Sequence, residues 1–318
     1  MKILYVVHRY APYPGGSEYY TQAMAEETLH RGHQVTVFAG QHQGPLNGVN
    51  VLNDARILQY PCDLIVVHGG DVNVQNFVLS NARNIPSPIL YMLVLPSESP
   101  VCVQALYDCT YIGWSTPQDW NHIVKYGVQQ KAVHIPHGIR LDISTCPVPN
   151  FKEHLGITGT MFLSCGGYWP NKAMRELSEL FIQANIPDAK LVLTGYDNSH
   201  NLMPAASTNV IPLLIGQHDR SQVINAIASA DCYLLHSYTE GFGLVLLESM
   251  VNRTPWVARN IAGATLMQNY GKVYNTDEEL KSILSTFNVY EFNTNTAYDY
   301  AVTHHSIVNT VDGILQLI

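Results

Sequence analysis

The sequence predicts an α/β protein made of two doubly wound, Rossmann-like domains with a cleft between them. Short apolar runs alternate with helical patterns through both halves of the chain, which is typical of parallel sheets covered by helices. Each half opens with an apolar run followed by a glycine pair, Gly15-Gly16 in the first half and Gly166-Gly167 in the second. At 318 residues the chain is long enough for two domains with filled cores.

In the first half, two patterns predict the start of a helix: Gly15-Gly16 followed by Ser17, and Pro117. A helix from Ser17 to Arg31 has Ser17 as its expected N-cap and Gly32 as its stop. A second helix follows Pro117 and ends near Gly127. The strands expected here are Ile3–Val7, Val35–Phe38, Leu64–Val67, Ile89–Leu95 and Tyr111–Trp114.

The linker is expected between Asp142 and Asn150, which contain two prolines and little periodicity. We therefore predict one Rossmann-like domain over residues 1–145 and a second over residues 146–318, with the last helix free to pack back on the first domain. The expected strands of the second half are Met161–Cys165, Leu191–Thr194, Val210–Leu214, Cys232–Leu235 and Trp256–Ala258. Its expected helices are Ala173–Ala184, Ser221–Ala230, one beginning at Gly243, one near Asp277–Thr286 and one over Val308–Ile318.

Composition excludes several classes of function. The net charge is −8 and no lysine or arginine cluster occurs, which disfavours binding to nucleic acid. The six cysteines have no CxxC or zinc spacing, so a reduced, cytoplasmic setting is expected. No metal-ligand pattern, secretory signal or apolar run of membrane-spanning length is found.

The segment His236–Met250 carries the strongest chemical signal. It places Glu240 and Glu248 on either side of Gly241 and Gly243, between an expected buried strand and an expected helix. A helix N-terminus attracts an anion, and a carboxylate about 7.5 Å further along the axis lies within reach of a vicinal diol. A sugar linked to a nucleoside diphosphate offers these groups. The alternative is two surface glutamates beside an ordinary turn.

Three further positions are candidates, each with a structural alternative. The Gly15-Gly16 turn is an anion site if it opens a helix, or else a packing turn. Lys172, after the second glycine pair, suits a leaving diphosphate or is simply solvated. His68 ends an expected strand and faces the ligand crevice of an open sheet, unless it is a core histidine.

The stretch EGFGLVLLESM, followed by Thr254-Pro255, resembles the E-x7-E motif of retaining GT-B glycosyltransferases of family 4. The first 40 residues are similar to that group's first strand, glycine loop, helix and second strand. Residues Lys131–Gly138 are similar to its IPNGV turn, and Cys165–Lys172 to its phosphate-binding segment.

This resemblance implies a GT-B fold and a hexosyltransferase-type enzyme (EC 2.4). The implied donor is a UDP- or GDP-linked sugar, used without a cofactor or metal. The acceptor is a carbohydrate, lipid-linked or small-molecule hydroxyl, reached in the cytoplasm or at a membrane surface. The implied catalytic residues are Glu240, Lys172 and His68. The implied donor-binding residues are Gly15, Gly16, Gly167, Lys172, Glu240, Gly241, Phe242, Gly243, Leu244 and Glu248.

The sequence departs from that group in three places, one of which is Arg253, where the group usually has a glycine before the Thr-Pro turn. The usual phosphate-binding arginine falls at Gly167 or Tyr168, which leaves Arg9, Arg140, Arg175 or Arg253 as substitutes. The usual sugar-site histidine is absent from Leu93–Glu98, where Ser97 or Glu98 takes its place or the contact is lost. These departures keep two alternatives open: a catalytically weak nucleotide-sugar binding subunit, and a nucleotide-sugar epimerase. A glycoside hydrolase is disfavoured because it needs no anion-binding glycine loops.

Overall fold

The computed structural model describes residues 1–145, 150–215 and 220–318, and the chain divides into two units. The first unit contains Met1–Arg140 and His304–Ile318, and the second contains Leu141–Thr303. The predicted domain boundary after residue 145 therefore lies five residues beyond the division. Most of the predicted linker falls in the 3-10 helix Leu141–Thr145 or outside the described residues.

The first unit is built on a seven-stranded sheet in the order β3-β2-β1-β4-β5-β6-β7, and all of its strand pairs are parallel. Its strands are β1 (Lys2–Arg9), β2 (Gln34–Gln41), β3 (Asn50–Leu52), β4 (Leu64–His68), β5 (Ile89–Met92), β6 (Tyr111–Trp114) and β7 (Ala132–His134). Its helices are α1 (Gly16–His30), α2 (Asn73–Ser80), α3 (Pro100–Asp108), α4 (Pro117–Lys125) and α12 (Ile307–Leu315). The central strands are apolar along their length because helices cover both faces of the sheet.

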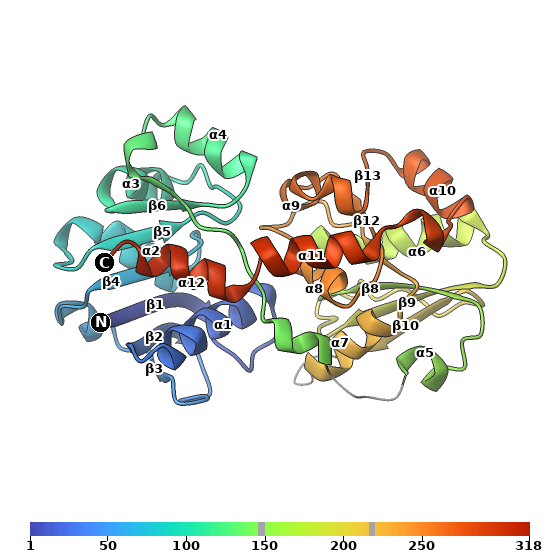
Figure 1. Cartoon of the computed structure of the whole chain (residues 1–318), viewed down its shortest axis with the longest axis horizontal. Helices are drawn as coiled ribbons and strands as arrows, with labels where there is room; N and C mark the ends of the chain where they lie inside the picture. The colour runs from blue at the N-terminus through green and yellow to red at the C-terminus, as the bar shows by residue number, and fades with distance from the viewer. Residues whose placement is uncertain (146–149, 216–219) are drawn as a thin grey trace. The chain divides into compact units, whose positions relative to one another are not determined.

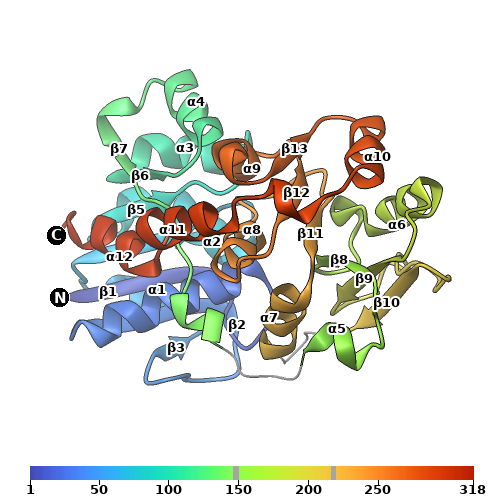
Figure 2. The same cartoon turned by 45° about the vertical axis from the view of Figure 1, so that its right-hand side comes forward.

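The C-terminal helix α12 belongs to the first unit, where it lies beside α1 (Figure 1, Figure 2). It buries Ile307, Thr310, Val311 and Ile314, which recur at the spacing of one helix face. At its edge, Asp312 accepts a 2.6 Å hydrogen bond from Arg31 at the end of α1. These contacts bring a segment from the end of the chain onto the first helix.

The second unit is built on a six-stranded parallel sheet in the order β10-β9-β8-β11-β12-β13. Its strands are β8 (Thr160–Cys165), β9 (Ala189–Gly195), β10 (Val210–Leu214), β11 (Cys232–Leu235), β12 (Trp256–Arg259) and β13 (Lys272–Tyr274). Its helices are α5 (Phe151–His154), α6 (Met174–Ala184), α7 (Arg220–Ser229), α8 (Leu244–Val251), α9 (Ala262–Leu266), α10 (Asp277–Ser285) and α11 (Thr294–His304), the last of which ends at the boundary between the units. The prediction of two doubly wound α/β units is confirmed.

Two local predictions were wrong. Helix α1 begins at Gly16, and its N-cap is Gly15 rather than Ser17. Gly15 has a φ of 153°, which glycine adopts without strain, and its carbonyl oxygen accepts the first helical hydrogen bond from Tyr19. Strand β5 ends at Met92, before the predicted Leu95, because Leu95 turns into the left-handed region (φ 53°) ahead of Pro96.

Candidate functional site

In the second unit, the candidate site lies where the sheet changes direction of growth, between β8 and β11. Ligands of open α/β sheets bind beyond the carboxyl ends of the strands at such a switch point. The ladder between these two strands stops at the pair Tyr233 and Leu163, although both strands continue. The hydroxyl of Tyr233 accepts a hydrogen bond from the Cys165 amide (3.0 Å) and donates one to its carbonyl oxygen (3.1 Å). Tyr233 thereby holds the end of β8 where the backbone ladder has ended.

Lys172 and Glu240 meet at this edge. Lys172 ends the 3-10 helix Pro170–Lys172, and its Nζ lies 2.6 Å from Glu240 Oε1. Both side chains are largely buried, 20% and 13% exposed. The two loops are also joined by a backbone hydrogen bond of 2.8 Å from Tyr238 to Asn171. Two of the three predicted catalytic residues, Lys172 and Glu240, therefore form a direct ion pair that links the β8 loop to the β11 loop.

Gly167 and Tyr168 complete the β8 loop by packing. A Cβ on Gly167 would lie 2.9 Å from the Trp169 ring. Tyr168 is fully buried, and its hydroxyl donates to the carbonyl oxygens of Leu193 and Leu213. The aromatic side chain is thus part of the sheet's support and does not present its ring to a ligand.

The turn between β11 and α8, with the first residue of α8, contains five of the residues predicted to bind the donor, at positions 240–244. Gly243 caps α8 with a φ of 84°, a conformation that favours glycine, and it makes no side-chain cap to the first helical N–H groups. Phe242 is buried, and its carbonyl oxygen lies so close to Gly263 that a Cβ there would be only 1.8 Å away. Gly241 and Leu244 are half-buried at the turn. The helix N-terminus therefore faces the switch point with backbone groups.

Glu248 lies on α8 and is 5% exposed. Its carboxylate contacts the guanidinium of Arg220, the first residue of α7. Sequence reasoning missed Arg220, because the two residues are 28 positions apart and only the tertiary fold joins them. An arginine at the start of a helix that follows a strand was the signal available, since such a position faces the carboxyl edge of the sheet.

A second missed cluster surrounds His236 at the end of β11. Arg259 donates to its Nε2 (3.0 Å) and, through the same nitrogen, to Asp277 (3.0 Å), while Nδ1 lies 2.6 Å from the Tyr274 hydroxyl. Arginine has only donors, so Nε2 carries the lone pair and Nδ1 carries the proton. Burial and then the Arg259 charge lower the pKa of His236 to about 4, which keeps the ring neutral at pH 7.

In the first unit, Gly15 and Gly16 open α1 at the carboxyl end of β1. The carboxylate of Glu18 lies over Gly15, where an added Cβ would be 2.1 Å from its Oε2. Arg9 contacts this carboxylate at 2.8 Å. Burial raises the pKa of Glu18, whereas Arg9 lowers it. In this structure the predicted anion position at the helix start is therefore filled by the chain's own carboxylate.

His68 ends β4 at the same edge of the first sheet, and it is 4% exposed. Neither of its ring nitrogens has a hydrogen-bond partner. Its ring centroid lies 5.0 Å from that of Tyr20 and 6.1 Å from that of His137. Burial lowers the pKa of His68 to about 4, so it is a neutral, buried imidazole at pH 7.

The arginines considered as substitutes for the missing phosphate cation have other partners. Arg9 binds Glu18, and Arg140 binds Glu26 of α1. Arg175 donates to the carbonyl oxygen of Asn201, and Arg253 lies 3.9 Å above the Tyr298 ring. None of these four contacts involves Lys172, Glu240 or Glu248.

The two residues suggested in place of the sugar-site histidine, Ser97 and Glu98, make hydrogen bonds within the first unit. Glu98 accepts hydrogen bonds from Lys125 and Tyr126, at the end of α4. Ser97 accepts one from the backbone amide of Ser99.

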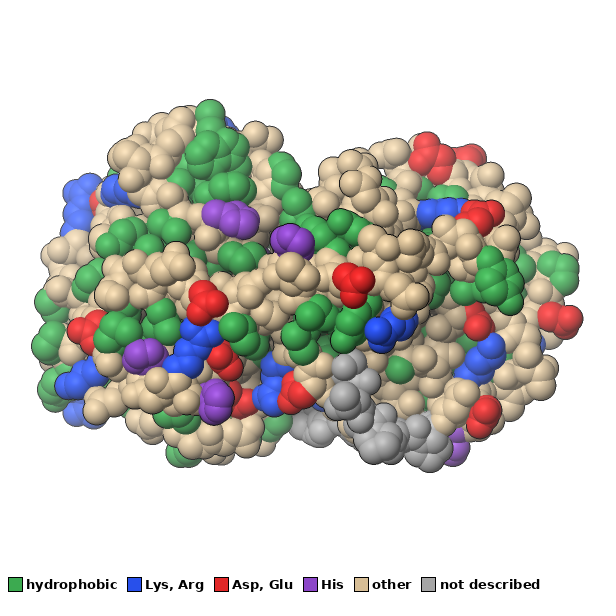
Figure 3. All heavy atoms as spheres, in the orientation of Figure 1, with side chains coloured by type: hydrophobic (Ala, Val, Ile, Leu, Met, Phe, Trp, Pro, Cys, Tyr) green, Lys and Arg blue, Asp and Glu red, His purple; other side chains and the backbone are tan. Residues whose placement is uncertain are grey.

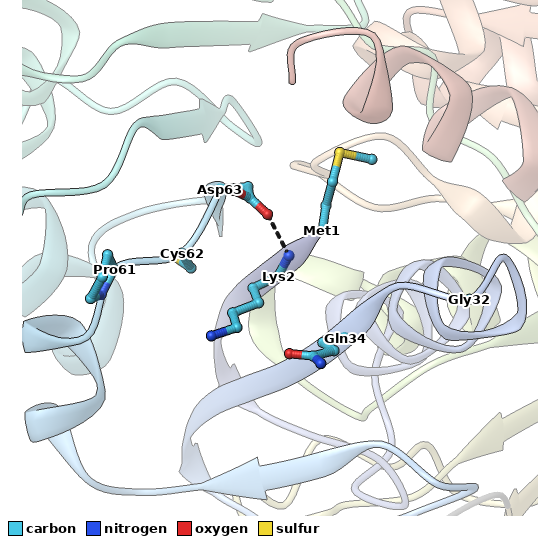
Figure 4. A pocket seen from close by; sticks show the side chains of 7 residues that line it. All are labelled: Met1, Lys2, Gly32, Gln34, Pro61, Cys62 and Asp63. Atoms are coloured by element: carbon cyan, nitrogen blue, oxygen red, sulfur yellow. Dashed lines mark hydrogen bonds between the residues drawn. The ribbon is translucent and has the colours of Figure 1, made fainter.

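Two surface features complete the description. On the face shown in Figure 3, lysine and arginine side chains lie singly or beside acidic ones, and the described residues there form no continuous basic area. Figure 4 shows a shallow pocket lined by Met1, Gln34 and Asp63, at the amino ends of β1, β2 and β4, opposite to the edge that carries His68.

Across residues 1–145, 150–215 and 220–318, no group of three His, Cys, Asp or Glu side chains could hold a metal ion. No helix in the described ranges is long and apolar enough to cross a membrane.

Comparison with known proteins supports a class for this site. A sucrose-phosphate synthase from Thermosynechococcus elongatus aligns with a TM-score of 0.77 at 16% identity, covering 99% of this chain and 98% of that one. The Anabaena protein HepE, in complex with UDP-glucose, aligns with a TM-score of 0.76 at 18% identity, covering 100% of this chain and 99% of that one. Among curated proteins, no sequence matches significantly. The fold is that of the GT-B glycosyltransferases.

Residues 149–271 match the family model described as Glycosyl transferases group 1. This range spans the β8 loop, Arg220, the Glu240–Glu248 turn and β12. Within this range the chain is similar to the group 1 glycosyl transferases, and the match supports a glycosyltransferase (EC 2.4).

Proposed function

We propose that this glycosyltransferase moves a sugar from a nucleoside diphosphate to a hydroxyl acceptor, with retention of the anomeric configuration. The observation that carries the proposal is the pair of cation–carboxylate contacts at the switch point, Lys172 with Glu240 and Arg220 with Glu248. A nucleoside diphosphate sugar needs cations for its phosphates and acceptors for its hydroxyl groups. Both kinds of group stand at one sheet edge.

In this proposal each side chain has a separate role. Lys172 binds the diphosphate and stabilises the negative charge that grows as the glycosidic bond breaks. Glu240 accepts hydrogen bonds from hydroxyls of the transferred sugar, and Glu248 accepts them from the ribose diol. Gly241, Gly243 and the start of α8 offer backbone N–H groups to the phosphates.

In this proposal the sugar transfer needs no protein side chain as a base. The bond between the anomeric carbon and the β-phosphate oxygen breaks, and a bond to the acceptor oxygen forms on the same face of the sugar. The departing phosphate oxygen takes the acceptor's proton. The lack of a histidine in Leu93–Glu98 is compatible with this scheme. His68, a neutral imidazole with unpartnered nitrogens, is proposed to contact the acceptor hydroxyl.

The donor is proposed to be UDP- or GDP-linked and to need no cofactor or metal. UDP-glucose is the first donor to test, because HepE was solved with it. The carbohydrate, lipid-linked or small-molecule acceptor and the cytoplasmic or membrane-surface location stay predictions.

The test begins with thermal shifts in UDP, GDP, ADP and their glucose or mannose conjugates, because a bound ligand raises stability. Nucleoside diphosphate release is then measured with and without a panel of sugar acceptors. Acceptor-dependent release with an α-linked product from an α-linked donor supports the proposal, and Glu240→Ala serves as the inactive control. An inverted product, or no thermal shift in any nucleotide, contradicts it.

A nucleotide-sugar binding subunit is the second candidate, favoured by the presence of Gly167 and Tyr168 where an arginine is expected. Binding of a donor without release in any acceptor would identify that function. Conversion of the donor's sugar without an acceptor would identify an epimerase.

A further inference from the structure

The contact between Arg220 and Glu248 has a chemical consequence that the other contacts at the switch point do not share. Glu248 is 5% exposed, whereas the Arg220 side chain is about one-third exposed, at 32%. A carboxylate buried to this degree needs a partner, and here the partner is the Arg220 guanidinium. A ribose diol that binds Glu248 must take the same carboxylate lone pairs, so it competes with Arg220.

Arg220 is also placed at the carboxyl edge of the sheet. It is the first residue of α7, which comes after β10 in the chain, and α7 packs against β8. The Gly166-Gly167 loop that leads to Lys172 begins at the end of β8, on the same edge. A guanidinium released from Glu248 therefore remains beside the loop that carries the other cation.

The charges of the site favour such a movement. Lys172 contacts Glu240 and Arg220 contacts Glu248, so the formal charges of the four groups sum to zero. A nucleoside diphosphate brings at least two negative charges, and a guanidinium forms its strongest hydrogen bonds with such oxygens. Lys172 alone leaves part of that charge unmatched.

We propose that Arg220 is a second phosphate-binding residue, held by Glu248 until the ribose of the donor displaces it. The proposal rests on the proposed function. It assigns the diphosphate of the nucleotide as the ligand of Arg220 and makes ribose binding and phosphate binding one coupled exchange.

A purely structural role is the alternative, since the same ion pair joins α7 to α8. A hydrogen bond of 2.7 Å from Thr254 to the carbonyl oxygen of Ile227 already attaches the end of α8 to α7. The two roles differ in what they do to ligands. A structural pair affects nucleoside and nucleotide binding alike, whereas the exchange affects only ligands that carry phosphate.

The experiment compares the affinities for UDP and for uridine in the wild type, R220Q, R220K and the control R175Q. The weaker binding of uridine is followed by ligand-observed NMR. Arg175 is an exposed arginine of the same unit that contacts a backbone carbonyl. We expect R220Q to weaken UDP about tenfold or more while uridine binds equally well or more tightly, because Glu248 is no longer occupied. R220K is expected to keep most of the UDP affinity, and R175Q all of it.

Equal weakening of UDP and uridine in R220Q, or unchanged UDP affinity, overturns the inference and leaves the proposed function standing. If R220Q does not fold, R220K is used instead. As the salt concentration is raised, the affinity of R220K for UDP must fall more steeply than its affinity for uridine, since the charges at positions 172 and 220 both act on phosphate. The same comparison is made with GDP and guanosine. If the wild-type protein binds none of these four ligands, the proposed function and this inference are overturned together.

Discussion

The hydroxyl of Tyr233 on β11 replaces the missing rung of the sheet ladder by bonding both backbone groups of Cys165 at the end of β8. Tyr233 is fully buried, and burial raises its pKa well above the ordinary value, so the hydroxyl stays protonated and can donate. This one side chain fixes the start of the loop that leads to Lys172.

Tyr233→Phe is therefore expected to cost about 1–3 kcal/mol of unfolding free energy, because it leaves two buried backbone groups of Cys165 without a partner. Activity should fall as well, since the β8 loop loses its attachment. Urea denaturation and initial rates measure the two effects. Tyr290→Phe, at a 93% exposed tyrosine, is the control and should change neither. A fully stable Tyr233→Phe would show that the hydroxyl does not support the strand end.

Glu240→Gln is expected to lower kcat by roughly a hundredfold or more, since the lost charge no longer orients the sugar or holds Lys172 in place. The unfolding free energy should also fall, by about 1–3 kcal/mol, because Lys172 loses the carboxylate with which it is largely buried. Glu179→Gln, at an exposed glutamate of α6, provides the matched control. Normal turnover by Glu240→Gln would remove this residue from the catalytic machinery.

Gly15→Ala is expected to destabilise the first unit by about 1–3 kcal/mol, because its backbone angles are nearly restricted to glycine. An added Cβ would also displace the Glu18 carboxylate and with it the partner of Arg9. Gly44→Ala separates the two causes, because Gly44 also has a positive φ (105°) but no atom lies within 4 Å of its added Cβ. Equal losses in the two variants would mean that the Glu18 contact contributes little.

The neutral, buried His68 predicts a pH dependence of stability. Its pKa is about 4 in the folded chain against about 6.5 when unfolded, so between these values only the unfolded chain binds the proton. Stability is therefore lost as the pH falls through this window, by about 2 kcal/mol between pH 7.5 and pH 5.

His68→Phe should remove that part of the dependence, which urea midpoints at the two pH values will show. His30→Gln, at an exposed histidine of α1, should leave the difference unchanged. A wild-type pH difference that persists in full in His68→Phe would assign it to the other buried histidines.

The sequence located the central elements well and the polar helices poorly. Strands β6, β10 and β11 have the predicted bounds, because each is a short apolar run with clear boundaries. Helices α2 and α11 are among those that were not predicted. In α11, six of the eleven residues are Thr, Tyr or Asn and no apolar stripe stands out, and α2 is only eight residues long. Their helical state depends on packing against the rest of each unit.

The candidate site also contains residues that the sequence indicated and residues that only the fold revealed. Lys172 and Glu240 were both candidates from the sequence because each follows an expected strand, but their ion pair was not predicted. Arg220 and the cluster of His236 with Arg259 were not candidates, because their partners come from distant segments and carry no local pattern.

The return of residues 304–318 to the first unit has a consequence for biosynthesis. The face of α1 that packs against α12 has no cover until residues 141–303 have left the ribosome. The amino-terminal sheet can thus assemble early, but its last layer arrives only after the whole second unit has been translated. Nascent chains are therefore expected to expose this face of α1 to chaperones during most of their synthesis.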